Sequence, residues 1–196
     1  MRTGLVLFLC GLVLGKAAVI PNDCHTIDVL NGKLLYDNRV TYMYEYFPTD
    51  YKLQVKYEEV LRCQNITALI NKGITVKELR YLWGIINYRV LSKMQAVLPL
   101  RHPSLSYVTE LQLLFHELQK EQEVESDVIL EILERLDRTE VKSVSPKALL
   151  DNCFRVLYAL YEDECKLCNP RSEEEALCPP PATPTPSDYQ RTYCES

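Results

Sequence analysis

Cysteine is the residue type in this sequence with the greatest capacity for chemistry, and two cysteines lie close together. Cys165 and Cys168 form a Cys-x-x-Cys pair, a spacing that supports thiol–disulfide redox chemistry or supplies two ligands to a zinc ion. A redox role needs the pair at the N-terminus of a helix, and zinc needs a second pair. Here a single pair follows a helical pattern, so we expect structural disulfides. An oxidoreductase built on Cys165 and Cys168 is the alternative.

Other residues that could bind a metal or catalyse a reaction are few. The histidines are His25, His102 and His116; none has a second histidine at metal-ligand spacing, and none lies in a His-Glu-x-x-His motif. The sequence also contains no Gly-x-Ser-x-Gly motif, no phosphate-binding glycine loop and no paired-carboxylate arrangement. We therefore predict a protein that is not an enzyme and uses no cofactor and no metal.

The first residues have the composition of a secretory signal peptide. Arg2 precedes an apolar run from Leu5 to Leu14, and Gly15-Lys16-Ala17 offers small residues for cleavage after Ala17. The run is too short to span a bilayer, and no other run in the sequence is long enough. We expect a signal peptide at residues 1–17 and a mature chain that is secreted, extracellular and not inserted in a membrane.

Secretion places the cysteines in an oxidising compartment, where disulfides form. Cys10 leaves with the signal peptide, and the seven cysteines that remain are an odd number, which implies a free thiol or an intermolecular bond. The disulfide candidates are Cys24, Cys63, Cys153, Cys165, Cys168, Cys178 and Cys194. The sequence does not determine how they pair.

Charge excludes two classes of partner. The formal net charge is −5, and neither a basic block nor a cluster of Lys and Arg on a helical face is present. We therefore expect no binding to nucleic acid and no membrane-surface role. Two features suit an extracellular protein: Asn65-Ile66-Thr67 is an N-glycosylation acceptor, which we place in a loop, and residues 169–196 have the proline-rich composition of a partly disordered tail.

Apolar residues at helical spacing predict four main helices. The helix from Ser145 to Cys168 opens with Ser-Pro, in which serine caps the helix and proline occupies the first helical position. Thr75 and Glu78 form a capping box for a helix that ends at Pro99, and the short link after it makes the next helix an antiparallel neighbour. The remaining helix runs from Ile27 to Pro48, with slips in its apolar pattern near Gly32 and Asp37-Asn38 at which it can kink.

Two minor elements complete the predicted architecture. Strict alternation over residues 51–57 predicts a strand whose only candidate partner is 141–144, and a shorter apolar stripe from Val128 to Leu136 predicts a minor helix. The fold class is therefore all-α: residues 18–168 form a short-chain four-helix bundle with a minor helix and a two-stranded ribbon in its long connections.

A secreted bundle without a catalytic site acts through its surface. Four tyrosines outside the apolar stripes suit an interface, although tyrosines also pack at the rim of a core: Tyr42, Tyr44, Tyr46 and Tyr88. A carrier that holds a small apolar ligand inside the bundle is the alternative function. The large continuous stripes favour a filled core instead.

Four segments resemble the interleukin-34 family of helical cytokines. They are LLYDNRVTYM from Leu34 to Met43, YFPTDYK from Tyr46 to Lys52, ELRYLW from Glu78 to Trp83 and, most specifically, PKALLDNCFRV from Pro146 to Val156. The resemblance covers Cys24 to Cys165. It implies a four-helix cytokine that forms a head-to-head homodimer and cross-links the macrophage colony-stimulating factor receptor, a receptor tyrosine kinase of monocyte-lineage cells. It leaves open whether cell-surface proteoglycans bind as well.

The resemblance also implies roles for individual residues. Cys24, Cys153 and Cys165 fall on family cysteines that join the last helix to the N-terminus, and Asn65 falls where the family carries a glycosylation acceptor. Receptor contacts in the family lie at the ends of the second and third helices. The corresponding exposed positions here are Arg89, Ser92, Lys93, Gln95, Glu117 and Lys120. Two departures are the run Glu162-Asp163-Glu164-Cys165, where the family has a cysteine cluster, and Cys63, which stands at an apolar position of the family.

Overall fold

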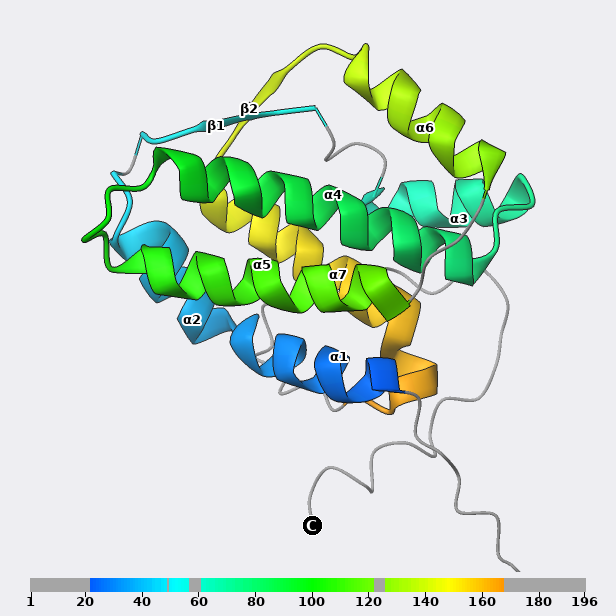
Figure 1. Ribbon diagram of the computed structural model, residues 1–196, viewed down its shortest axis with the longest axis horizontal. Helices are drawn as coiled ribbons and strands as arrows, with labels where there is room; N and C mark the ends of the chain where they lie inside the picture. Colours follow the sequence, from blue (N-terminus) through cyan, green and yellow to red (C-terminus); the bar gives the residue numbers. More distant parts are fainter. Residues whose placement is uncertain (1–21, 49, 57–60, 122–125, 168–196) are drawn as a thin grey trace, which may run out of the picture.

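The computed structural model describes residues 22–48, 50–56, 61–121 and 126–167. The chain forms an all-α bundle with one small ribbon, as the sequence predicts (Figure 1). The helices are α1 (Asn22–Lys33), α2 (Tyr36–Val40), α3 (Cys63–Asn71), α4 (Val76–Val97), α5 (Ser104–Glu121), α6 (Asp127–Asp137) and α7 (Pro146–Cys165), with a π-helical segment η1 (Thr41–Glu45) and strands β1 (Leu53–Val55) and β2 (Lys142–Val144). The predicted signal peptide and tail lie outside the described residues.

The core is enclosed by four helical rows: the consecutive segments α1, α2 and η1 form the first row, and α4, α5 and α7 each form one of the others. The row α1–α2–η1 and helix α4 run in one direction, α5 and α7 run in the other, and the long connections carry α3, β1, α6 and β2 (Figure 1). Helices α1 and α4 each pack against both α5 and α7. Leu30, Leu82, Leu111 and Leu157, one from each row, are fully buried between them. This arrangement is the up-up-down-down order of helical cytokines.

The predicted caps are present at both long helices. Thr75 and Glu78 form the capping box of α4, with the Thr75 amide donating to Glu78 Oε2 at 2.8 Å. Ser145 Oγ accepts the Ala148 amide at α7, and Pro146 occupies its first turn. At its other end α7 stops at Lys166, which has φ 51°. This left-handed conformation lets the Leu167 amide donate back to the Glu162 carbonyl at 3.3 Å.

The first row is broken rather than being the single helix from Ile27 to Pro48 that the sequence predicts. Leu35 has extended backbone angles, φ −57° and ψ 152°, and separates α1 from α2. Asn38 Nδ2 donates to the Gly32 carbonyl at 3.2 Å, which satisfies one of the carbonyls left open at the end of α1. The wider η1 turn then follows directly on α2. The break turns Leu34 and Arg39 into the core, where both are fully buried.

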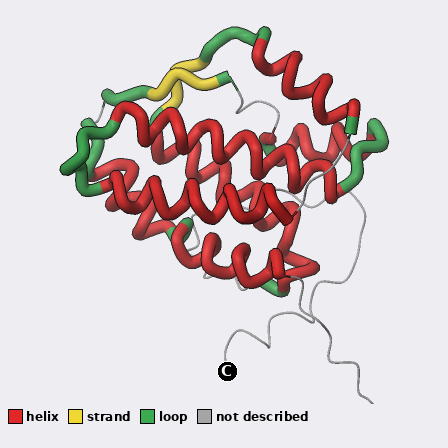
Figure 2. Tube along the Cα trace, in the orientation of Figure 1, coloured by secondary structure: helices red, strands yellow, loops and turns green. Residues whose placement is uncertain are grey.

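The predicted ribbon is confirmed, although it is shorter than the alternating segment (Figure 2, yellow). Leu53 pairs with Val144 and Val55 with Lys142 in antiparallel register. Leu53 and Val55 face the core and Gln54 faces solvent, as the alternation requires. The ribbon crosses one end of α4 and leads the chain into α7.

Helix α3 was not predicted, and it corrects the expected position of Asn65. The asparagine lies in the first turn of α3 rather than in a loop. Arg62 at the N-cap makes no side-chain hydrogen bond to the helix, so the segment lacks the local start signal that α4 and α7 carry. Tertiary packing of Ile66 stabilises α3 instead. Asn65 itself remains partly exposed.

Cysteine pairing corrects one expectation. Cys24 on α1 is bonded to Cys165 at the end of α7, with a Cα–Cα distance of 5.2 Å, and Cys63 is disulfide-bonded as well. Cys153 is a free, buried thiol, so the disulfide role implied for it is wrong. The reason is geometric: Cys153 lies on the core face of α7 among the apolar side chains. Burial raises the pKa of its thiol, which stays protonated and unreactive.

Candidate functional site

Side-chain hydrogen bonds join α4 to α5 along the length of this hairpin. Gln95 Nε2 donates to Thr109 Oγ1 at 2.9 Å, and Gln112 Nε2 donates to Ser92 Oγ at 2.7 Å. Toward the other end, Gln119 Nε2 donates to the Gly84 carbonyl at 3.1 Å. Such bonds fix the register of the two helices, so the outer face of the hairpin is a preorganised surface.

Two of the predicted contact residues belong to this seam rather than to an open surface. The Ser92 hydroxyl donates to the Tyr88 carbonyl at 2.8 Å while accepting from Gln112, and Gln95 bonds Thr109. Both side chains are partly buried. Their polar groups therefore hold α4 and α5 in position. Helical periodicity describes each helix separately, so it did not predict these contacts between two helices.

The remaining predicted residues lie on two different sides of the hairpin. Arg89 faces α6, with Nη1 3.7 Å from Asp137 Oδ1, and Lys93 is partly buried one turn further along α4. Glu117 and Lys120 form an exposed pair on α5, with 3.0 Å between Lys120 Nζ and Glu117 Oε1. Both side chains of this pair are more than half exposed. The pair is therefore the part of the predicted set that is freely accessible to a partner.

Exposed apolar residues gather at one end of the bundle. The end of η1 and the α4–α5 turn are neighbours there, because His102 Nε2 lies 3.1 Å from the Tyr46 carbonyl and Ser104 Oγ donates to the Tyr42 carbonyl at 2.6 Å. We define the bundle-end patch as Tyr44, Tyr46, Val97 and Leu100. Leu100 is 93% exposed. Helical periodicity gives no indication of Leu100, whose signal is instead an apolar residue between Pro99 and Pro103 in a tight turn.

The four tyrosines proposed as interface residues differ in their exposure to solvent. Tyr44 and Tyr46 are exposed, whereas Tyr42 and Tyr88 pack against the core. Tyr42 stacks on Tyr107 with 4.4 Å between ring centroids. Tyr88 lies beside His116 on the neighbouring helix, at 5.7 Å. Only the pair at the end of η1 is therefore available to a partner.

The described residues offer little to a metal or to a small apolar ligand. Among them, no group of three or more His, Cys, Asp or Glu is placed to hold a metal ion. A surface cleft of about 180 Å³ opens between α1 and α5, but its lining includes Lys33, Ser106 and Glu110. This polar lining does not suit the apolar cargo of a carrier. Cys165 of the Cys-x-x-Cys pair is bonded to Cys24 rather than to its neighbour.

Comparison with known families agrees with this geometry. Within the described residues, no helix combines the length and the apolar character needed to cross a membrane. A family model described as Interleukin 34 matches residues 17–169, most of the chain and all of the described bundle. This is a family of receptor-binding cytokines and not of enzymes. The chain therefore belongs to the interleukin-34 family of cytokines.

Proposed function

We propose that this cytokine is secreted as a homodimer that binds the macrophage colony-stimulating factor receptor. Each dimer would bring two receptors together, so that their kinase domains phosphorylate each other. The signal promotes survival, proliferation and differentiation of monocytes and macrophages, in innate immunity and inflammation. One observation carries the proposal: a bundle of this family presents a rigid α4–α5 face and, at one end, an exposed apolar patch.

The first experiment measures binding of the purified, secreted chain to the immobilised receptor ectodomain of the same species. Light scattering on the same sample gives the oligomeric state. We expect a dimer that binds saturably at nanomolar concentration. A folded dimer that does not bind at micromolar concentration would contradict the receptor assignment and leave the fold unaffected.

Exchange of the charges at Glu117 and Lys120 tests the accessible part of the α5 face. The double variant Glu117→Lys, Lys120→Glu is expected to weaken receptor binding about 10-fold, which corresponds to about 1.4 kcal/mol. The physical reason is that reversed charges disturb electrostatic complementarity with the receptor, while an exposed i,i+3 pair contributes little to folding. Surface plasmon resonance on matched samples measures the effect.

A matched control for this exchange exists on α6. Glu131 and Arg135 form a similarly exposed pair, with 3.8 Å between Arg135 Nη2 and Glu131 Oε1. The variant Glu131→Arg, Arg135→Glu should bind the receptor as the unaltered protein does. Equal loss of binding in both variants would show that long-range charge, and not the α5 face, determines the affinity.

The bundle-end patch is our candidate for the dimer contact. Leu100→Glu is expected to raise the dimer dissociation constant at least about 10-fold, because the dimer contact would bury a charge in place of the apolar side chain that is 93% exposed in the single chain. Sedimentation at several concentrations measures this constant. Leu130→Glu on α6, where Leu130 is 60% exposed, is the control that should dimerise normally. Unchanged dimerisation of Leu100→Glu would place the dimer contact elsewhere.

A further inference from the structure

His102 connects the two halves of the bundle-end patch. Its own amide donates to the Pro99 carbonyl at 2.9 Å, which closes the turn that carries Leu100. Its ring reaches the end of η1, where Nε2 lies 3.1 Å from the Tyr46 carbonyl, one of the carbonyls that the end of a helix leaves open. His102 therefore joins the α4–α5 turn to the end of η1.

The hydrogen bonds of the His102 ring determine where its proton lies. The Ser104 amide donates to Nδ1 at 3.1 Å, and because an amide N–H only donates, Nδ1 carries no proton. A carbonyl only accepts, so the proton is on Nε2 and is donated to the Tyr46 carbonyl. We call these two ring bonds the His102 bridge. The His102 bridge requires a neutral imidazole.

A second proton on the ring would break the bond to α5. It would lie on Nδ1 and face the N–H of Ser104, a residue that is fully buried, so a buried donor would be left without an acceptor. The positive end of the α5 helix dipole lies beside the same nitrogen and also opposes the added charge. Ser104 in turn contacts η1, because its hydroxyl donates to the Tyr42 carbonyl at 2.6 Å. Protonation therefore loosens the contact between α5 and η1.

The surroundings of the ring do not offset a positive charge. The Phe47 ring lies 5.1 Å from the imidazole, between ring centroids, but a cation–π contact at so open a site is weaker than the cost of a buried amide without an acceptor. Within the described part of the chain, no carboxylate pairs with the His102 ring. The ionisable side chains of the elements around it are Tyr42, Glu45 and Tyr46 on η1, Asp50 and Tyr51 after η1, Arg101 in the turn and Tyr107 on α5.

We propose that His102 is the positioning residue of the bundle-end patch and makes the dimer sensitive to pH. The inference rests on the proposed function in one respect, that this patch is the dimer contact. Histidine is the side chain that ordinarily gains a proton between about pH 8 and pH 5. Near neutral pH the His102 bridge holds Leu100 and Tyr46 in one arrangement. In an acidic compartment the bond to Ser104 is lost, the patch loses this arrangement and the dimer weakens.

Sedimentation at about pH 7.5 and about pH 5 tests the effect on the dimer. We expect the dissociation constant of the unaltered protein to rise about 10-fold on acidification, because each protomer loses a buried hydrogen bond. In His102→Asn the change should be less than about 3-fold, because the asparagine oxygen can accept the Ser104 amide in an Asx turn and gains no proton. An equal pH dependence in His102→Asn and the unaltered protein would overturn the proposal.

A matched control removes a histidine far from the patch. His25 is exposed on α1, whose start lies at the other end of the bundle from the α4–α5 turn (Figure 1). The variant His25→Gln should keep the full pH dependence of the unaltered protein. Loss of the pH dependence in His25→Gln would show that His102 is not the group responsible.

Two measurements on the ring and its partners do not depend on dimer formation. In nitrogen NMR of the unaltered protein near neutral pH, we expect the His102 ring to carry its proton on Nε2, and a proton on Nδ1 instead would overturn the proposal. Amide hydrogen exchange, corrected for the intrinsic effect of pH, should show that Ser104 loses protection on acidification in the unaltered protein and keeps it in His102→Asn. Unchanged protection of Ser104 would also overturn it. A monomer that shows this loss of protection would contradict the proposed dimer contact and confirm the His102 bridge.

Discussion

The Asp151→Ala variant is expected to lose about 3 kcal/mol of unfolding free energy, because it removes the carboxylate that faces a buried cation. Arg39 Nη1 lies 2.7 Å from Asp151 Oδ1, and the Arg39 side chain is 1% exposed. The Phe154 ring covers the guanidinium at 4.4 Å. Burial lowers the pKa of Arg39, and the Asp151 charge opposes that shift. Without the carboxylate, the guanidinium loses the largest charge that offsets its desolvation penalty.

Replacing Arg39 should lower the free energy of unfolding less than replacing Asp151 does, because Arg39 is buried and Asp151 is partly exposed. The Asp151 side chain is 21% exposed and also accepts from Lys147 Nζ at 2.8 Å, so it stays paired when Arg39 is replaced. Arg39→Met keeps most of the side-chain volume, and we expect it to lose about 1 kcal/mol. The double variant Arg39→Met, Asp151→Ala should be more stable than Asp151→Ala alone.

Urea unfolding at one fixed protein concentration measures these differences, since dimer formation makes stability depend on concentration. A change in midpoint at constant slope reports a change in stability. Two results would contradict this explanation: Asp151→Ala lowers the free energy of unfolding less than Arg39→Met, or the double variant is the least stable of the three. Either would show that Asp151 does not stabilise the fold by pairing with the buried cation.

The sequence was sufficient to predict a helix start or a strand wherever neighbouring residues carry the signal for it. Ser145-Pro146 and the pair Thr75 and Glu78 satisfy the first amides of their own helices, so three or four residues determine where α7 and α4 begin. Alternation around Leu53 predicted the strand of the ribbon, because the pleat repeats every two residues. The family motifs were long enough to identify the family from the sequence.

The sequence was insufficient to predict the burial and the partners of a side chain wherever its contacts come from a distant segment. Arg39 resembles a solvated helix residue until α7 brings Asp151, 112 positions away, against it. The slip in the apolar pattern near Gly32 indicated an irregularity in the first row, but no proline or side-chain cap marked the break at Leu35. Among the proposed receptor contacts, Ser92 and Gln95 lie in the helix seam because α5 supplies Gln112 and Thr109. Helical periodicity assigns such residues to a face but does not show what covers that face.

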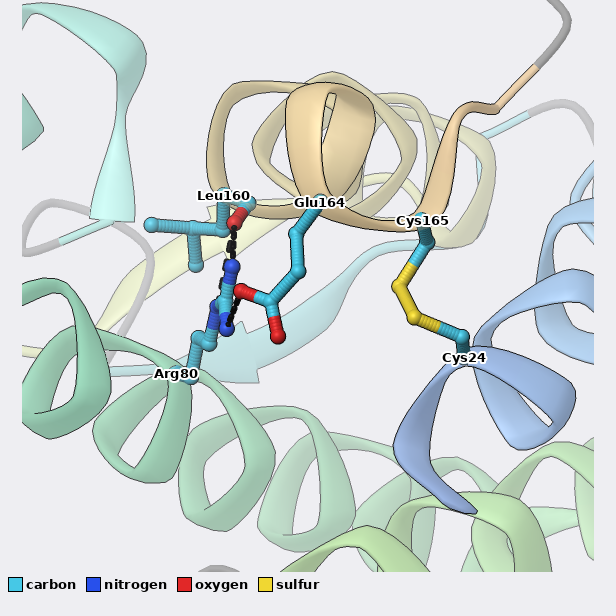
Figure 3. Close-up of a disulfide and its surroundings, with 5 residues drawn as sticks. All are labelled: Cys24, Arg80, Leu160, Glu164 and Cys165. Carbon is cyan, nitrogen blue, oxygen red and sulfur yellow. Dashed lines mark hydrogen bonds and ion pairs between the residues drawn. A yellow bond between two sulfur atoms is a disulfide. The ribbon is translucent and has the colours of Figure 1, made fainter. Parts of the chain in front are cut away.

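The end of α7 combines two kinds of attachment. Figure 3 shows Cys24 bonded to Cys165 on one side and Arg80 reaching from α4 on the other. Arg80 Nη2 and Nε donate to the Leu160 carbonyl at 2.6 and 3.0 Å, Arg80 pairs with Glu164, and its guanidinium lies 4.3 Å from the Tyr161 ring centroid. Arg80 would still anchor α7 to α4 without the disulfide, whereas α1 would lose its covalent link.

The double variant Cys24→Ser, Cys165→Ser is therefore expected to remain folded but to lose about 3–5 kcal/mol of unfolding free energy. The bond joins residues 141 positions apart, and removing so long a cross-link restores much conformational freedom to the unfolded chain. Amide hydrogen exchange should accelerate most in α1, while α4 stays protected. Cys153→Ala, which leaves the disulfide intact, is the control and should cost about 1 kcal/mol. A loss no larger than in this control would show that packing of α1 against α5 and α7, rather than the disulfide, holds the first helix in place.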